Sequence, residues 1–290
     1  MGEPALAPVS ETLFLTLYAR ALESRRPDPI VRDVVAERVT EALNPRFARS
    51  PLRLHRKLAA GRLPRLLLTT LALRTRHFDR LVLDFRRRHP DGVVVSLGCG
   101  LSTRCHRLDD GTLRWVGVDL PPAIAVRREL LPDTERFTTL GASVLDEAWM
   151  EPLPAVPPDR VLFLAEGLFM YLEAASVRRL VARLRERFPG AELAAEFADA
   201  GLVRLNQTRL GRGKMRRQFG LSEDVWFASG LADAREIEDW APGVELLGTW
   251  SHLDDHEARL GWMRGFSWWN ALGRPLFVVH ARLGAPGSAA

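Results

Sequence analysis

The feature that most constrains the fold is a run of β-branched residues that ends in two glycines. Residues 93–97 read Val-Val-Val-Ser-Leu and are followed by Gly98-Cys99-Gly100. An apolar run this short and continuous is typical of a strand buried on both faces, as in a parallel sheet covered by helices. Because glycine lacks a Cβ, Gly98 and Gly100 let the backbone turn sharply and approach a ligand closely. The run therefore predicts a buried strand that leads into a ligand-binding turn.

A second apolar run places an acidic residue where it can reach the same turn. Residues 115–118 read Trp-Val-Gly-Val, and Asp119 follows. A carboxylate at the tip of the second strand of a doubly wound sheet lies beside the glycine turn and can accept both hydroxyls of a ribose. Leu101 follows Gly100, and no third glycine completes the dinucleotide fingerprint. The pattern favours a cofactor with adenosine but no pyrophosphate, of which S-adenosylmethionine is the common one. The alternative is a purely structural turn.

From residue 93 onward the chain alternates apolar runs with helical patterns, which predicts βαβ crossovers and a parallel sheet. The candidate strands cover residues 93–97, 113–118, 136–140, 161–165 and 191–197. Two later runs, residues 244–249 and 275–283, predict an antiparallel pair that closes the sheet. The expected fold class is α/β: a Rossmann-like doubly wound sheet, mostly parallel with an antiparallel closing strand.

The residues before the sheet carry a helical pattern. Apolar residues recur at helical spacing after Ser10, which predicts a helix with Ser10 as its N-cap. A second helix is expected over residues 31–43, because Asn44-Pro45 disfavours the α region at the residue before proline. Residues 53–64 read as irregular, and a long helix is expected over residues 66–88.

These patterns predict one integrated domain in two parts. Residues 1–90 are expected to form a helical cap that closes over the cofactor, and residues 91–290 to form the Rossmann-like core. Polar residues and glycines interrupt the pattern at about residues 201–230, as a lid or substrate-recognition insertion does. A chain of 290 residues, 47% of them hydrophobic, is long enough to bury such a core.

Charge and cysteine content exclude several other classes of protein. The net charge is +5, but the basic residues are scattered among acids, so nucleic-acid binding is a minor alternative. The two cysteines, Cys99 and Cys105, have the spacing of neither a zinc knuckle nor a disulfide framework, and no metal site is expected. Apolar runs fall far short of the ~20 residues that span a bilayer. With no recognisable signal peptide, a cytoplasmic location without a membrane partner is expected.

Six short motifs follow one another along the chain. They are residues 21–29 (ALESRRPDP), 73–79 (LRTRHFD), 96–104 (SLGCGLSTR), 118–121 (VDLP), 142–146 (ASVLD) and 165–172 (AEGLFMYL). Together they resemble the leucine carboxyl methyltransferase family, especially its bacterial branch of small-molecule carboxyl O-methyltransferases of the tetracenomycin polyketide type. The resemblance covers about residues 11–200. It implies a class I methyltransferase fold and an S-adenosylmethionine-dependent O-methyltransferase of secondary metabolism, with S-adenosylhomocysteine as a product.

The resemblance also implies cofactor-binding roles for individual residues. These are Arg74 for the methionine carboxylate, Gly98 and Gly100 for the amino-acid moiety, Asp119 for the ribose, Ser143 and Val144 for the adenine, and Glu166 for the amino group. A planar guanidinium suits a carboxylate because it can donate two parallel hydrogen bonds. The alternatives are a surface role for Arg74, with Arg76 in its place, and a helix-capping role for Asp119. A carboxylate as deep in an apolar run as Glu166 is costly without a basic partner, which favours a ligand-binding role.

The predicted acceptor is the carboxylate of a small, polyketide-like or aromatic acid. A carboxylate is ionised at neutral pH and needs no general base, so no catalytic residue is certain, and the protein has to position the acceptor. Tyr171, Arg204 and Asn206 are the main candidates for that task, with Arg20 and Gln207 as further ones.

Two alternatives to a carboxylate acceptor stay open. A phenolic or alcoholic acceptor has to lose a proton, and His252 or His256 is then the candidate base. A non-catalytic nucleoside-binding protein is the second alternative. Whether the protein is a monomer or a homodimer is left open.

Overall fold

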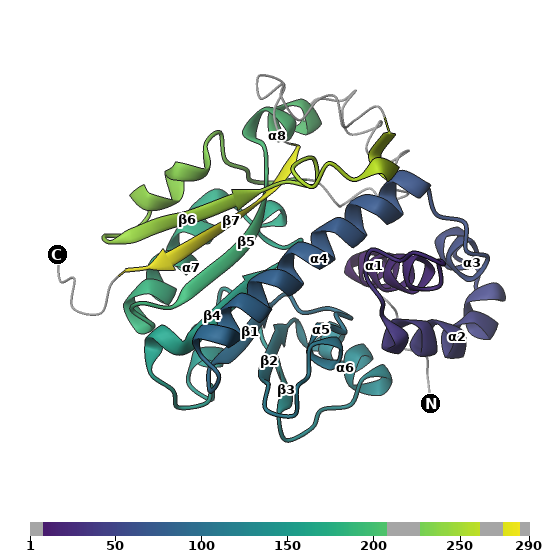
Figure 1. Ribbon diagram of the computed structural model, residues 1–290, viewed down its shortest axis with the longest axis horizontal. Coiled ribbons are helices and arrows are strands. Elements are labelled where there is room, and N and C mark those ends of the chain that lie inside the picture. The colour runs from purple at the N-terminus through teal and green to yellow at the C-terminus, as the bar shows by residue number, and fades with distance from the viewer. Residues whose placement is uncertain (1–7, 208–226, 262–274, 285–290) are drawn as a thin grey trace.

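The fold is organised on a seven-stranded sheet with helices on both faces (Figure 1). A computed structural model describes residues 8–207, 227–261 and 275–284 of the chain. The strands are β1 (Val93–Leu97), β2 (Arg114–Asp119), β3 (Phe137–Gly141), β4 (Val161–Ala165), β5 (Glu192–Ala198), β6 (Val244–Trp250) and β7 (Leu276–Leu283). All seven coincide with predicted strands to within a residue or two; β1, β4 and β5 are buried along their whole length.

The strand order, β3-β2-β1-β4-β5-β7-β6, is that of a doubly wound sheet closed by an antiparallel strand. Strands β1 to β5 pair in parallel, while β7 lies antiparallel between β5 and β6. The parallel strands therefore end at one edge of the sheet, where ligands bind in open α/β folds. The register pairs Ala165 of β4 with Ala195 of β5, which brings Glu166 and Glu196 level at that edge.

Helices cover the two faces of the sheet. The α-helices are α1 (Pro8–Ser24), α2 (Val34–Ala48), α3 (Arg53–Ala59), α4 (Arg65–Arg88), α5 (Arg104–Arg107), α6 (Pro121–Leu130), α7 (Ala174–Arg187) and α8 (Ala200–Gln207). The 3-10 helices are η1 (Ala148–Met150), η2 (Pro158–Arg160), η3 (Phe169–Tyr171) and η4 (Ala234–Asp239). One face packs against α4 and the other against α7 and η4; Figure 1 shows α4 running across the sheet in front of the strands.

The N-terminal helices α1, α2 and α3 pack around their own aromatic core and against the turn after β1. Phe47 lies edge-on to Phe14 and stacks on Tyr18 and on His55, with ring centroids 4.9, 5.6 and 4.0 Å apart. Leu101, which follows the glycine turn, is buried in the same cluster. The cap helices are thus attached directly to the segment that carries the glycines.

Three predictions for this region are wrong. Helix α2 does not stop before Pro45 but continues to Ala48, because burial of Phe47 in the aromatic core outweighs the hydrogen bond that proline cannot donate. Residues 53–59, expected to be irregular, form α3, which buries His55 and Leu58. Ser10 is not an N-cap, since α1 already includes Pro8.

Other differences concern short segments. The segment from Asp233 to Trp240 is a 3-10 helix, η4, with Asp233 and Glu236 forming a capping box. Helix α8 occupies the start of the predicted 201–230 insertion, and residues 208–226 lie outside the described residues. No helix among the described residues is long and apolar enough to cross a membrane.

The central strand β4 gives a test of this core. Phe163 is fully buried between Trp149 and Phe188. We expect Phe163→Ala to lower the free energy of unfolding by about 3–5 kcal/mol through lost burial and a residual cavity. The exposed Leu83→Ala of α4 is the control and should change it by less than about 0.5 kcal/mol. Urea denaturation followed by circular dichroism measures both, and equal losses would contradict the assignment of this core.

Candidate active site

The acid at the end of β2 lies beside the glycine turn after β1 and is hydrogen-bonded to it. The backbone N–H of Gly100 donates to Oδ2 of Asp119 at 2.8 Å, and the N–H of Leu120 donates to Oδ1 at 2.8 Å. Asp119 is only 9% exposed. Burial raises the pKa of its carboxyl, and the two N–H donors offset part of that rise. Asp119 is thus a fixed acceptor at the edge where ligands bind.

Both glycines of the turn are required by the backbone. Gly98 has φ +63° and Gly100 has φ +46°, in the left-handed region that side chains disfavour. A Cβ on Gly100 would lie 2.7 Å from Leu13 of α1. The carbonyl of Gly100 accepts a hydrogen bond from Arg127 of α6 at 2.9 Å. The turn is therefore held by β2, α1 and α6 together.

A continuous chain of ion pairs runs along the same side of the molecule. It alternates basic and acidic residues in the order Arg20, Asp33, Arg107, Asp79, Arg104, Glu166, Arg74, Glu196. Its N···O distances lie between 2.7 and 3.1 Å, and each side chain exposes 15% or less. We call these eight residues the charge chain. Because its four arginines balance its four acids, the charge chain is neutral overall.

The two acids that share Arg74 differ in their electrostatics. Arg74 donates from Nε to Glu166 and from Nη1 to Glu196, both at 2.9 Å. Glu166 also accepts from Arg104 at 2.7 Å; burial favours its neutral form, but Arg104 and Arg74 together lower its pKa to about 2. Glu196 has Arg74 as its ion-pair partner, and burial raises its pKa despite that guanidinium.

These contacts change the basis for two predictions. Arg74 is buried against Glu166 and Glu196, so it is no surface residue. A structural role for Glu166 required a basic partner, and the structure provides two, since Arg74 and Arg104 both reach it. Its burial is therefore explained without a ligand, and the ligand-binding role stays a prediction.

Two other arginines have structural partners. Arg76, the alternative to Arg74, pairs with Asp255 at 2.9 Å. Arg20 pairs with Asp33 and donates to the carbonyl of Leu101 at 2.7 Å, so it joins α1 to the turn after β1. Arg76 therefore has its partner outside the charge chain, whereas Arg20 is the first member of that chain.

The loop after β3 carries Ser143 and Val144, the residues predicted to contact the adenine. Ser143 is half-buried and its Oγ accepts from the N–H of Leu145. Val144 is 7% exposed and packs in the core, where its carbonyl accepts from Trp149. The apolar side chains that this region exposes are Leu145, at 37%, and Leu120, at 44%, next to Asp119. Two leucines therefore expose apolar surface after the ends of β2 and β3.

The three positioning candidates have different surroundings. Tyr171, in η3, is partly exposed, and its ring centroid lies 5.7 Å from that of Phe227. Burial and the negative charge of Glu196 both raise the pKa of Tyr171, which places this residue beside the end of the charge chain. Arg204 is exposed on α8, and Asn206 lies in the last turn of that helix.

The candidate bases lie in the turn that follows β6. His252 and His256 are not on one helical face, because the segment between them is a turn and His256 has φ +48°. His252 is half-buried, and burial lowers its pKa, an effect that Asp254 partly offsets. The turn is attached to α4 through Asp255, which accepts from Arg76.

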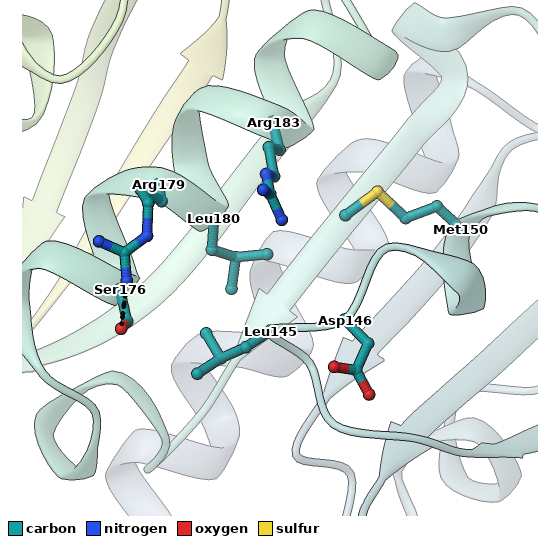
Figure 2. Close-up of a pocket in the computed structure, with 7 residues that line it drawn as sticks. All are labelled: Leu145, Asp146, Met150, Ser176, Arg179, Leu180 and Arg183. Carbon is teal, nitrogen blue, oxygen red and sulfur yellow. Dashed lines mark hydrogen bonds between the residues drawn. The ribbon is translucent and has the colours of Figure 1, made fainter.

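A pocket of about 70 Å³ lies elsewhere, between α7 and the segment after β3 (Figure 2). Its lining consists of Leu145, Asp146, Met150, Ser176, Arg179, Leu180 and Arg183. Figure 2 shows Arg179, Leu180 and Arg183 projecting from α7, with Leu145, Asp146 and Met150 across from them. Asp146 is not the N-cap of a helix, since η1 begins after Glu147. None of these residues belongs to the charge chain.

Sequence reasoning also missed Asp79, Arg104 and Glu196. Asp79 and Arg104 end two of the motifs that carried the family resemblance, so they were visible as motif residues without a role. Glu196 stands in the apolar strand β5, buried at 3% exposure. The cost of burying a carboxylate in an apolar strand, which singled out Glu166, applies equally to Glu196.

Comparison with known proteins decides the family. The family model described as leucine carboxyl methyltransferase matches residues 14–185. The chain belongs to the leucine carboxyl methyltransferase family. The tetracenomycin polyketide synthesis O-methyltransferase of Streptomyces glaucescens is 31% identical over 256 residues, which cover 88% of this chain and 87% of that protein. An S-adenosyl-L-methionine-dependent methyltransferase of Gibberella zeae is 29% identical over 296 residues, covering 94% of each chain.

The solved structures support the fold. A DUF574-family protein from Streptomyces avermitilis superposes with a TM-score of 0.54 at 17% identity, over 92% of this chain and 97% of that one. The predicted class I methyltransferase fold is confirmed. As a member of this family, the protein is an S-adenosylmethionine-dependent methyltransferase, and the predicted cofactor is confirmed with it.

Arg104 tests the energetic importance of the charge chain. Arg104→Met removes the guanidinium between Asp79 and Glu166, and we expect it to lower the free energy of unfolding by about 3–5 kcal/mol at pH 7. With a lowered pKa, Glu166 stabilises the fold above its ordinary pKa of 4.5 and loses that contribution as the pH falls toward about 2. The difference between variant and wild type should therefore shrink over that range. Denaturant unfolding at several pH values measures it, and a constant difference would contradict the assignment.

Proposed function

We propose that this methyltransferase transfers a methyl group to the carboxylate of a small, polyketide-like or aromatic acid, giving a methyl ester. The similarity to the tetracenomycin polyketide synthesis O-methyltransferase supports an oxygen acceptor on a polyketide-like molecule, and membership of the leucine carboxyl methyltransferase family supports a carboxylate. The observation that carries the proposal is the neutral charge chain beside Asp119, which contains no unpaired cation and no free base among its eight residues. Such a site suits an acceptor that arrives already ionised.

The residues at the sheet edge fit the cofactor. Asp119 offers carboxylate oxygens for the ribose hydroxyls beside a turn whose glycines leave no Cβ in the way. The exposed Leu120 and Leu145 offer apolar surface for the adenine ring. Arg74 would hold the methionine carboxylate and Glu166 the amino group. Both already lie within one hydrogen-bonded cluster, so little reorganisation is needed.

The chemistry divides simply between cofactor and protein. S-adenosylmethionine supplies an activated methyl group on a sulfonium ion. The protein has to bind the acceptor, exclude water and hold one carboxylate oxygen toward the methyl group. Tyr171, whose pKa responds to the charges of Glu196 and Arg74, is our candidate to donate a hydrogen bond to the acceptor. No proton has to be removed, because a carboxylate is ionised at neutral pH.

A hydroxyl acceptor is the second candidate, and it needs a base. His252 has a lowered pKa and stays neutral at physiological pH, which suits a base. However, the turn that carries His252 is attached to α4 through the pair of Arg76 with Asp255. The charge chain is attached to α4 through Arg74, so the turn and the charge chain are held at different positions of that helix. The non-catalytic alternative is disfavoured, because the relatives are enzymes.

The ribose role of Asp119 can be tested by binding. We expect Asp119→Ala to weaken S-adenosylhomocysteine binding by about 10- to 100-fold, because hydrogen bonds to a charged acceptor contribute about 1.5–3 kcal/mol. Asp119→Asn keeps one oxygen and should lose less, while Asp109→Ala, in an exposed pair with Arg136, should leave affinity unchanged. Isothermal titration calorimetry measures all three, and wild-type affinity in Asp119→Ala would remove the ribose assignment.

The acceptor class can be tested with labelled cofactor and a panel of free acids and phenols. A base-labile labelled product is an ester, whereas a base-stable one is an ether. If the acceptor is a carboxylate, His252→Ala and His256→Ala should each keep the rate within a few-fold of wild type. A loss of about 100-fold or more with a changed pH profile would favour the hydroxyl mechanism.

A further inference from the structure

Glu196 occupies a particular place in the charge chain, because it is the terminal acid. Arg104, Arg107 and the acid between them, Asp79, each touch two partners of opposite charge, whereas Arg74 is the one ion-pair partner of Glu196 among the described residues. Its other polar contact among the described residues is the backbone N–H of Gly167. With 3% of its surface exposed, Glu196 depends on Arg74 to remain ionised.

The effect of cofactor binding on Glu196 follows from the proposed function, on which the inference rests. If the methionine carboxylate of the cofactor binds Arg74, one guanidinium faces three carboxylates. The amino group of the cofactor compensates Glu166, which also keeps Arg104. Within the part of the chain that the structure describes, no second cation pairs with Glu196.

We propose that Glu196 takes up a proton when the cofactor binds and stays neutral in the complex. The groups that face it are Arg74 from α4, Glu166 from the end of β4, the N–H of Gly167 and the phenol of Tyr171 from η3. Of these, Arg74 alone brings a positive charge. A neutral carboxyl removes the repulsion that an ionised Glu196 would exert on an anionic acceptor, so protonation prepares the site for a carboxylate.

The direction of the existing electrostatics agrees with this role. Burial already raises the pKa of Glu196 in the free protein, and the neighbouring charge of Glu166 raises it further against the effect of Arg74. When the cofactor carboxylate draws the guanidinium of Arg74 away from Glu196, the pKa of Glu196 rises again. At pH values between the pKa of Glu196 in the free protein and its pKa in the complex, the complex holds one more proton than the free protein and free cofactor together. Affinity for the cofactor should then fall as pH rises through that interval, by up to about tenfold per pH unit.

Isothermal titration calorimetry with S-adenosylhomocysteine tests the proposal. Titrations from about pH 5 to pH 9, in buffers of different ionisation enthalpy, report the number of protons taken up. We expect uptake that approaches one proton in part of this range in wild type. Glu196→Gln, which is permanently neutral, should show none attributable to this site, and its affinity should exceed that of wild type by about tenfold or more at the alkaline end of the interval.

Glu192→Gln is the matched control, because Glu192 stands on the same strand but pairs with Arg88 and His280 away from the site. Its proton uptake should equal that of wild type. Binding without proton uptake in wild type, or uptake that persists in Glu196→Gln, overturns the inference and leaves the proposed function intact. Absence of binding by wild type at every pH instead overturns both.

Discussion

The interaction on which the rest of the site depends is the sharing of Arg74 between Glu166 and Glu196. A buried charge is tolerated only when it is paired. In the charge chain, each buried charge forms an ion pair with a residue of opposite charge, and the ion pairs are linked end to end. The charge chain thereby connects α1, the segment before α2, α4, α5, and the ends of β4 and β5. Removing an interior member takes one of two partners from each of its neighbours, so the site and the attachment of the cap helices are energetically coupled.

The sheet was predictable from the sequence and the charge chain was not, for a physical reason. A strand such as β1 is specified by five consecutive residues, and the place of Asp119 follows from the topology that such strands imply. The pairs of Arg74 with Glu166 and Glu196 join residues 92 and 122 positions apart, and no local pattern records them. The same limit explains Pro45: a local rule ends the helix there, but packing of Phe47 continues it.

Paired burial also changes how a buried acid is interpreted. Glu166 was singled out because an unpaired carboxylate in an apolar strand is costly, yet Arg74 and Arg104 neutralise it. Burial therefore does not by itself identify a ligand-binding acid. What distinguishes the site is the combination of that paired acid with a guanidinium at the sheet edge and with Asp119 at the neighbouring glycine turn. The groups are oriented before any ligand arrives, which is the arrangement that makes fixed charges effective.

Charge balance finally links the structure to the kind of acceptor it suits. With Glu196 neutral in the cofactor complex, the charge chain carries one net positive charge and S-adenosylmethionine adds another through its sulfonium, so an acceptor with one negative charge lowers the net charge of a poorly hydrated site. A neutral phenol offsets none of that positive charge until its proton departs. The protonation state of Glu196 in the cofactor complex therefore separates the two acceptor classes: a neutral Glu196 can donate a hydrogen bond to a carboxylate but cannot accept a proton from a phenol.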